Sequence, residues 1–316
     1  MVLANSTPFI FTELGFPIWI RILFSVAAPI FIFLSGFNCA LNFSKKKIFE
    51  WKRPIQILLI AILIDCFIWQ TRPFQTFDIL YLIATCLIIW NLLFYLVSKP
   101  QSFIFYITLI ALSLTMLPIK YTFDLPDNAS STIFYCVKRW LWDGWFPLIP
   151  WLAISGFGVL YFYFKNKIDQ KTKWLLIISL FFFTSFILHN YYTDKWLNAS
   201  REGYLEIFYP LQNFILLFAF GIIFLLPFIL KKTFKLPIVS FAGQHSLFFY
   251  FFHLSIISFI IEPFFAAKKI NISILNYIMF VLCWIAVIFM LNFLVAKLKQ
   301  LNTNKMIKTI YFFIGL

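Results

Sequence analysis

The sequence predicts an all-α integral membrane protein, and its composition carries most of this prediction. Of the 316 residues, 62% are hydrophobic, 22% are aromatic and only 12% are charged. Average soluble chains have about 45–50% apolar and about 25% charged residues. No soluble single-core domain could bury so much apolar surface and stay dissolved. The composition therefore excludes a water-soluble enzyme, a disordered chain, a collagen-like repeat and a disulfide scaffold.

Nine apolar segments are long enough to cross a bilayer, which takes about 20 mostly apolar residues per helix. Their apolar runs are unbroken, which favours helices over barrel strands, because barrel strands alternate with period two. No repeat and no soluble domain is visible, so we expect residues 1–316 to form one bundle, with 297–316 as a cytoplasmic tail. The nine segments lie near residues 17–41, 54–70, 79–97, 103–119, 145–164, 174–191, 210–230, 244–265 and 273–296.

Charged residues orient these spans. Most of the 26 basic residues follow spans one, three, five and seven or lie in the tail, a distribution that places this face in the cytoplasm. Of the 12 acidic residues, only Glu50 and Asp169 share that face. The net charge of +14 is therefore interpreted as cytoplasmic loops and not as a nucleic-acid surface. A cytoplasmic C-terminus after nine spans puts the N-terminus outside, and because no signal peptide follows Met1, we expect one further helix upstream.

Three segments resemble a single family. Residues Arg21–Gly36 are similar to a helix with the pattern R…AAPxFxFLxG. Residues Trp145–Trp151 and the glycines that follow them are similar to a DxFPLLPW…G span start, and residues Ala242–His253 to a GxxSLxxYxxH element. The three patterns occur in the order of the catalytic-domain family of heparan-alpha-glucosaminide N-acetyltransferase, within the transmembrane acyltransferase superfamily. The resemblance implies that the membrane domain binds acetyl-CoA and delivers acetyl to an amino sugar or other glycan on the non-cytoplasmic side.

The resemblance also implies catalytic residues. Asn5 matches the Asn of the family's MxxxN element, and Asp143 aligns with the Asp before its FPLLPW element. The family has a loop His after this Asn, but no His lies between Asn5 and Arg21. Glu13, the one ionisable residue there, could replace that His as the base if burial raised its pKa. His189, near the outer end of span six, fits a general base, although anchoring among interfacial tyrosines explains it equally. The missing loop His favours direct transfer over an acyl-His intermediate.

Candidate acceptor-binding residues gather near the outer ends of the spans. Arg21 and Asp65 lie at such depths, where they either form a structural ion pair or hold the acceptor. Arg139 and Trp142 precede span five, and Trp145 begins it. The indole rings of Trp142 and Trp145 either stack on a sugar or belong to the aromatic belt that is common at membrane interfaces.

Candidate CoA-binding residues lie in and before span eight. Cations beside a helix N-terminus suit phosphate groups, although cytoplasmic lysines and an N-cap serine explain the same pattern. An ionisable group deep in a span faces a bundle interior or a wet cavity, so His253 either lines the acyl path or bonds a neighbouring helix. The candidates are Lys231, Lys232, Lys235, Gln244, His245, Ser246 and His253.

The sequence thus predicts a membrane acyltransferase that moves acetyl from cytosolic acetyl-CoA to a glycan amine or hydroxyl at the periplasmic face of a bacterial inner membrane. No metal-ligand spacing occurs, so no metal is expected. The expected partners are the bilayer and a glycan acceptor, with a homo-oligomer left open and no nucleic acid. Two alternatives stay open: a transporter or flippase for a lipid-linked or anionic solute, which would predict an inverted repeat, and a non-catalytic family member.

Overall fold

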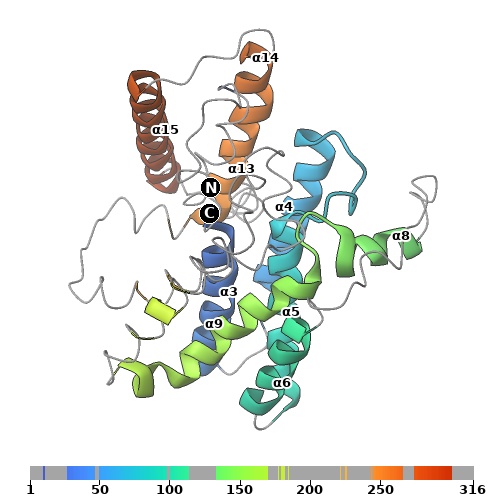
Figure 1. Ribbon diagram of the computed structural model, residues 1–316. Helices are drawn as coiled ribbons and strands as arrows, with labels where there is room; N and C mark the ends of the chain where they lie inside the picture. Colours follow the sequence, from blue (N-terminus) through green and yellow to red (C-terminus); the bar gives the residue numbers. More distant parts are fainter. Residues whose placement is uncertain are drawn as a thin grey trace.

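The fold is known from a computed structural model that describes residues 10, 27–46, 50–97, 100–113, 133–169, 177, 179–181, 184, 221, 225, 243, 245–265 and 274–300. Every regular element within these ranges is helical (Figure 1). The longer helices are α3 (Ala27–Lys46), α4 (Lys52–Leu63), α5 (Ile79–Leu96), α6 (Pro100–Ser113), α9 (Leu148–Asp169), α13 (Ser246–Ile256) and α15 (Ile274–Gln300). The shorter ones are α8 (Ile133–Lys138), α14 (Glu262–Phe265) and the π-helical turns η2 (Ile64–Ile68), η5 (Arg139–Asp143) and η7 (Ile257–Ile261).

Three stretches of this part of the chain are long and apolar enough to cross a membrane: Ala27–Lys45, Ile79–Leu96 and Ser246–Phe265. Large apolar side chains also cover the outside of the helices, and this is a surface that lipid rather than water would cover. The all-helical membrane fold is therefore confirmed in this coarse form. The spans expected at 174–191 and 210–230 lie largely outside the described residues, so the count of nine and the orientation stay predictions. The exposed apolar side chains include Tyr95, Leu96, Phe103, Tyr106, Ile110, Phe259, Ile260, Phe264, Met290 and Phe293.

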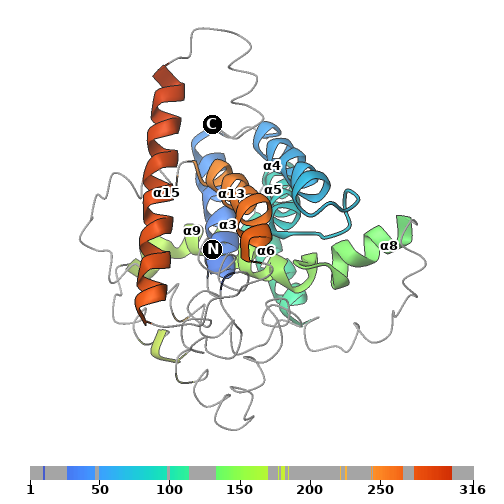
Figure 2. The same ribbon diagram turned by 90° about the horizontal axis from the view of Figure 1, so that it is seen from above.

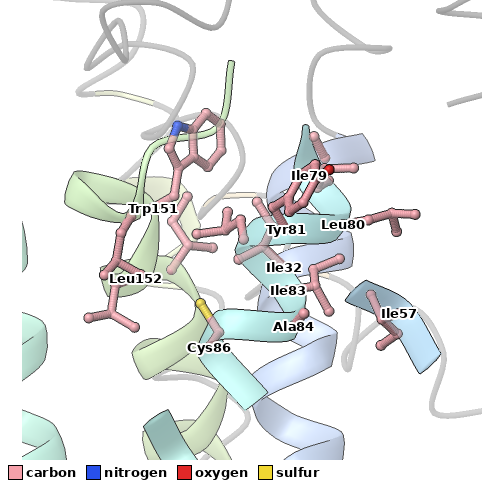
Figure 3. Close-up of a cluster of buried hydrophobic side chains, with 14 of the residues drawn as sticks. Ile32, Ile57, Ile79, Leu80, Tyr81, Ile83, Ala84, Cys86, Trp151 and Leu152 are labelled. Carbon is pink, nitrogen blue, oxygen red and sulfur yellow. The ribbon is translucent and has the colours of Figure 1, made fainter. Parts of the chain in front are cut away.

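Helix α5 is the centre of the bundle. It packs against α4 on one side and against α3 and α9 on others (Figures 1 and 2). Figure 3 shows its buried residues Ile79, Tyr81 and Cys86 lying between Ile57 of α4 and Trp151 of α9. Because most of the first eight residues of α5 are less than 4% exposed, the start of this helix is held from nearly every side.

Small residues let α3 and α9 cross at close range. A Cβ built on Gly36 would collide with the main-chain oxygen of Ser155, and a Cβ on Gly158 would collide with the main-chain oxygen of Phe33. Close backbone approach at glycine is a common way for membrane helices to associate, because lipid supplies no hydrophobic force between them. The hydroxyl of Ser155 accepts a hydrogen bond from Trp90 Nε1 at 2.9 Å, which ties α5 to the same crossing.

Prolines explain two helix boundaries. Pro100 opens α6, at a position where the missing N–H costs nothing. Ile149 has extended dihedrals (φ −102°, ψ 121°) because it precedes Pro150, so the regular part of α9 begins after the kink. At the other end of the chain α15 continues to Gln300, four residues into the stretch that we expected to be tail.

The helical stretch from α13 through η7 to α14 lies between the central helices and α15 (Figures 1 and 2). Its inner face adds Leu247, Tyr250 and Leu254 to the main core. Other side chains of this stretch contact α15: Ile257 clusters with Trp284, and Phe248 and Phe249 cluster with Leu291. The late part of the chain is thereby joined to the early part through α13.

We predict that Gly36→Val and Gly158→Val each lower the thermal unfolding midpoint of the protein in detergent. The added side chain would meet backbone atoms and not a flexible side-chain end, and overpacking of this kind costs about 1–3 kcal/mol. Gly243→Ala is the matched control, because a Cβ there would meet nothing within 4 Å. Unchanged midpoints for both valine variants would contradict the close α3–α9 crossing.

Candidate functional site

The loop of residues 69–78, between η2 and α5, is the structural centre of the candidate site. Gln70, Phe74 and Phe77 adopt positive φ values of 51°, 63° and 46°, which non-glycine residues rarely do. Such conformations persist only where the surrounding structure imposes them, and they cluster at functional sites. The hydrogen bonds around Asp65 and Asp78 provide that constraint.

Asp65 fixes the position of the loop through hydrogen bonds. Its carboxylate accepts hydrogen bonds from the hydroxyls of Thr76, at 2.5 Å, and Tyr81, at 2.8 Å. Its main-chain oxygen accepts from the N–H of Thr71 at 2.9 Å. The Tyr81 hydroxyl oxygen in turn accepts from the N–H of Phe74 at 3.2 Å. Asp65 is fully buried, and the π-helical turn η2 directs it into the bundle.

Asp78 is the N-cap of α5, and its two oxygens have different tasks. Oδ1 accepts from the N–H of Ile79 at 2.6 Å, which satisfies a free donor at the helix start. Oδ2 accepts from the hydroxyl of Tyr250 at 2.7 Å, a contact between residues 172 positions apart. Burial raises the pKa of the Asp78 carboxyl, which lies just before the stretch Ile79–Leu96, to about 6.

His253 lies one turn beyond Tyr250 on the same face of α13. The two rings contact edge to face, with centroids 5.2 Å apart. Nδ1 of His253 is 2.9 Å from the main-chain oxygen of Phe249, so Nδ1 carries the proton in the neutral ring. The second nitrogen is then the basic one. His253 is 2% exposed, in agreement with the expectation that it faces the bundle interior.

The segment before α9 runs beside the same loop. The N–H groups of Trp145 and Phe146 donate to the main-chain oxygens of Thr76 and Phe77, both at 3.0 Å. Gly144 makes this approach feasible, because a Cβ there would lie 2.6 Å from the Cβ of Phe77. The motif that resembles the family's span start is thereby placed next to Asp78.

Arg139 and Trp145 also contact this loop through their side chains. The guanidinium of Arg139 donates to the main-chain oxygen of Gln75 at 2.9 Å and lies 5.1 Å from the ring centre of Tyr135. The indole of Trp145 contacts that of Trp69 edge to face, at 5.2 Å between centroids. Arg139 and Trp145 are thus both fixed against the loop, Arg139 at Gln75 and Trp145 at Trp69.

A cavity of about 520 Å³ lies between α3, α4, α5 and the start of α13. Its lining runs along α5 from Leu80 to Asn91 and along α3 from Phe31 to Asn42. At 1.5 Å per residue, these stretches correspond to a length of about 16 Å. The volume is in the range of small-molecule sites, about 300–1,000 Å³. The structure therefore contains a long cavity parallel to the central helices.

The two ends of this cavity differ in chemistry. Asn42, Glu50 and Arg53 line the end where α3 stops and α4 begins. The exposed Lys45 and Lys52 flank the same end. Leu80 and Leu247 line the other end and belong to the first turns of α5 and α13, next to Asp78 and Tyr250. The cavity thus leads from a charged end to an apolar end beside the buried carboxylate.

The structure brings several predicted site residues together and describes others only in part. Asp65, Arg139 and Trp145 surround the loop of residues 69–78. Ser246 lines the cavity, and His245 is the buried residue before α13. Trp142 and Asp143 belong to η5, but their side chains are outside the described part. Asn5, Glu13, Arg21, His189, Lys231, Lys232, Lys235 and Gln244 lie outside the described residues.

One detail differs from the sequence-based expectation. Ser246, expected at the cytoplasmic rim, lies beside the first turns of α5, because Tyr250 one turn later contacts Asp78. Asp65 is bonded to the hydroxyls of Thr76 and Tyr81, and its expected ion pair with Arg21 or contact with the acceptor stays a prediction, because Arg21 lies outside the described residues. Its carboxylate thus has a structural task among the described residues.

Sequence reasoning missed the residues that complete this site. Asp78 stands directly before an apolar run, which is the usual signal of an N-cap, and this signal was available. Asn38 and Asn42 are four residues apart on an apolar helix, a spacing that predicts a shared polar face. No signal in one sequence pairs Asp78 with Tyr250. No sequence signal distinguished Asn91 as a site residue in the apolar run of α5.

Comparison with known proteins agrees with the resemblance of the motifs. Residues 7–175, more than half of the chain, match the family described as heparan-alpha-glucosaminide N-acetyltransferase, catalytic. This chain belongs to that family. The match contains the segments Arg21–Gly36 and Trp145–Trp151, whereas Ala242–His253 and all of α13 lie beyond it. No curated protein and no solved structure matches the chain. The family and the apolar helices together indicate a membrane protein with an acetyltransferase-like function.

We predict that Asp65→Ala destabilises the protein and that Asp65→Asn does so much less. Alanine leaves the buried hydroxyls of Thr76 and Tyr81 without their acceptor, at about 1–3 kcal/mol, whereas asparagine keeps one acceptor oxygen. The measurement is the thermal unfolding midpoint in detergent. Glu262→Ala, which removes an exposed acid, is expected to change nothing. Equal midpoints for Asp65→Ala and the parent protein would contradict the assigned task of Asp65.

Proposed function

We propose that this protein is a membrane acyltransferase that moves an acetyl group from cytosolic acetyl-CoA to an amine or hydroxyl of a glycan at the periplasmic face of a bacterial inner membrane. The cavity between α3, α4, α5 and α13 is the observation that carries this proposal, together with membership of the family. Acetyl-CoA is highly charged and made in the cytosol, whereas the glycan lies outside. A path along the helices lets the acetyl group reach the acceptor without carrying the whole cofactor across.

The dimensions and lining of the cavity suit the acetyl-pantetheine arm of CoA. This arm is a slender chain with two amide groups, each with one donor and one acceptor. Asn38, Asn42 and Asn91 supply carboxamides, which can both donate to and accept from such amides. Because the lining is about 16 Å long, the arm extends along it while the nucleotide stays at the charged end.

The charged end of the cavity suits the phosphates. Arg53 lines that end and donates to Gln56 at 3.0 Å, which fixes the position of the guanidinium. Arg side chains recognise phosphate through paired donors. In the proposed arrangement Arg53 acts with Lys231, Lys232 and Lys235, while Gln244, His245 and Ser246, which are consecutive at the start of α13, lie beside the arm.

The reaction takes place at the apolar end. The carbon–sulfur bond of the thioester breaks, a bond to the acceptor nitrogen or oxygen forms, and the acceptor loses a proton while the thiolate gains one. Asn5 would polarise the thioester carbonyl, and this helps only if its amide is directed at the developing oxyanion. Glu13, Asp143 or His189 would take the proton, and His253 would line the acyl path. The acceptor is held by Arg21, Arg139, Trp142 and Trp145.

The test is transfer of label from acetyl-CoA to glucosamine-type glycan acceptors by membranes that contain the protein. We expect label in the acceptor and an apparent affinity for acetyl-CoA that falls about tenfold in Asn91→Leu, because a buried hydrogen-bonding partner of the arm is lost. Asn292→Leu on α15 is the matched control. It removes the same amide from another apolar helix, outside the cavity lining, and leaves the affinity unchanged.

Two outcomes would contradict the proposal. The first is the absence of label from every acceptor, and movement of a lipid-linked or anionic solute in the same membranes would then favour a transporter. The second is an equal loss in Asn91→Leu and Asn292→Leu, because the cavity would then have no special part in acetyl-CoA binding.

A further inference from the structure

The hydrogen bond between Asp78 and Tyr250 joins two walls of the cavity that come from distant parts of the chain. Asp78 precedes α5, and Leu80, two residues later, lines the cavity. Tyr250 belongs to α13, and Leu247, three residues earlier, lines the cavity from the other side. Residues three and four apart on a helix share a face, so Tyr250, Leu247 and Ser246 form one stripe.

This hydrogen bond is well placed to set the separation of those walls. Asp78 is 5% exposed and Tyr250 is 6% exposed, so water does not compete for the contact. The other oxygen of Asp78 is bonded to the first N–H of α5, so the carboxylate moves only with that helix. The contact therefore fixes the start of α13 against the start of α5 from inside the bundle.

The two walls also differ in origin. The α3, α4 and α5 walls lie inside the segment 7–175 that matches the family, whereas Gly243, Ser246 and Leu247 lie beyond it. The cavity is incomplete without these later residues. A link that brings them to the matched segment is therefore part of what forms the cavity.

From these contacts we infer that Asp78 and Tyr250 are positioning residues that hold the α13 wall against the α5 wall. The cavity thereby stays narrow enough for both walls to contact an extended ligand. The significance for acetyl-CoA rests on the proposed function. The contact between the two walls does not depend on acetyl-CoA, and it is tested without any ligand.

The test uses Cys39, which lines the cavity and is 4% exposed, as a reporter of its opening. In a protein that retains Cys39 as its single cysteine, the rate of labelling by N-ethylmaleimide measures access to the cavity. A second protein that retains only Cys86, which is fully buried outside the cavity lining, reports general loosening of the bundle.

Tyr250→Phe removes the hydroxyl and keeps the ring. We expect labelling of Cys39 to accelerate about tenfold or more, as loss of a buried hydrogen bond to a carboxylate implies, while labelling of Cys86 stays unchanged. Ser255→Ala is the control. It removes a hydroxyl from α13 whose hydrogen bond, to the main-chain oxygen of Phe251, lies within that helix and joins no two walls, so labelling of Cys39 stays at the parent rate.

Asp78→Asn distinguishes a positioning role from a general need for a charge. Its Oδ1 still caps α5, and its amide can donate to the hydroxyl oxygen of Tyr250, so we expect nearly parental labelling of Cys39. In acetyl transfer, Tyr250→Phe is expected to raise the KM for acetyl-CoA about tenfold, with kcat within about twofold of the parent. Adding Asp78→Asn to Tyr250→Phe is expected to restore neither the KM nor the labelling rate of Cys39.

The outcomes separate this inference from the proposed function. An unchanged Cys39 rate in Tyr250→Phe overturns the inference, whatever happens to acetyl transfer. Equal acceleration at Cys39 and Cys86 also overturns it, since the hydrogen bond would then support the whole bundle. Selective acceleration at Cys39 supports it, even if no variant transfers acetyl, in which case the proposed function alone fails.

Discussion

The structure depends on one constraint: a polar group buried in an apolar helical bundle must find its partner within the protein. Asp65 and Asp78 are the clearest cases, because both carboxylates are buried and both are bonded to tyrosine hydroxyls. These bonds determine where the loop of residues 69–78 lies, where α5 begins and which face α13 presents. Hydrogen bonds from protein hydroxyls to these two carboxylates, in place of water, therefore organise this end of the bundle.

The same constraint explains why the cavity has its particular lining. The central helices are apolar almost throughout, and several of their few carboxamides and hydroxyls line the cavity. Asn38, Asn42 and Asn91 line the cavity, and Ser35 and Ser246 add hydroxyls to it. A passage with scattered amide groups and one charged end is suited to a chain of alternating apolar and amide segments. The proposed use by acetyl-CoA follows from that match.

Much of this arrangement was predictable from the sequence. Hydropathy located the helices α3, α5 and α15, and the short motifs identified the family before any comparison. His253 stood out because an ionisable residue in an apolar run needs a buried environment. Local pattern also contained the N-cap signal of Asp78, which was overlooked among ten outer acids.

The remaining features depend on contacts between distant residues, which one sequence does not encode visibly. Asp78 and Tyr250 are 172 positions apart, and neither has a spacing that points to the other. The depth of Ser246 follows from that contact, which is why the span-based expectation placed it at the rim. Asp65 is bonded to Thr76 of the loop and Tyr81 of α5, which are 11 and 16 positions away, and no helical spacing predicts these partners.

The central claim is that acetyl-CoA and acceptor reach one passage from opposite faces of the membrane. The direct measurement is acetyl transfer in sealed proteoliposomes of known protein orientation, with labelled acetyl-CoA on one side and a glucosamine-type acceptor enclosed on the other. We expect transfer when acetyl-CoA is on the side of Arg53 and the acceptor is on the opposite side, and no transfer when the two are exchanged. Transfer that requires both on the same side would contradict it.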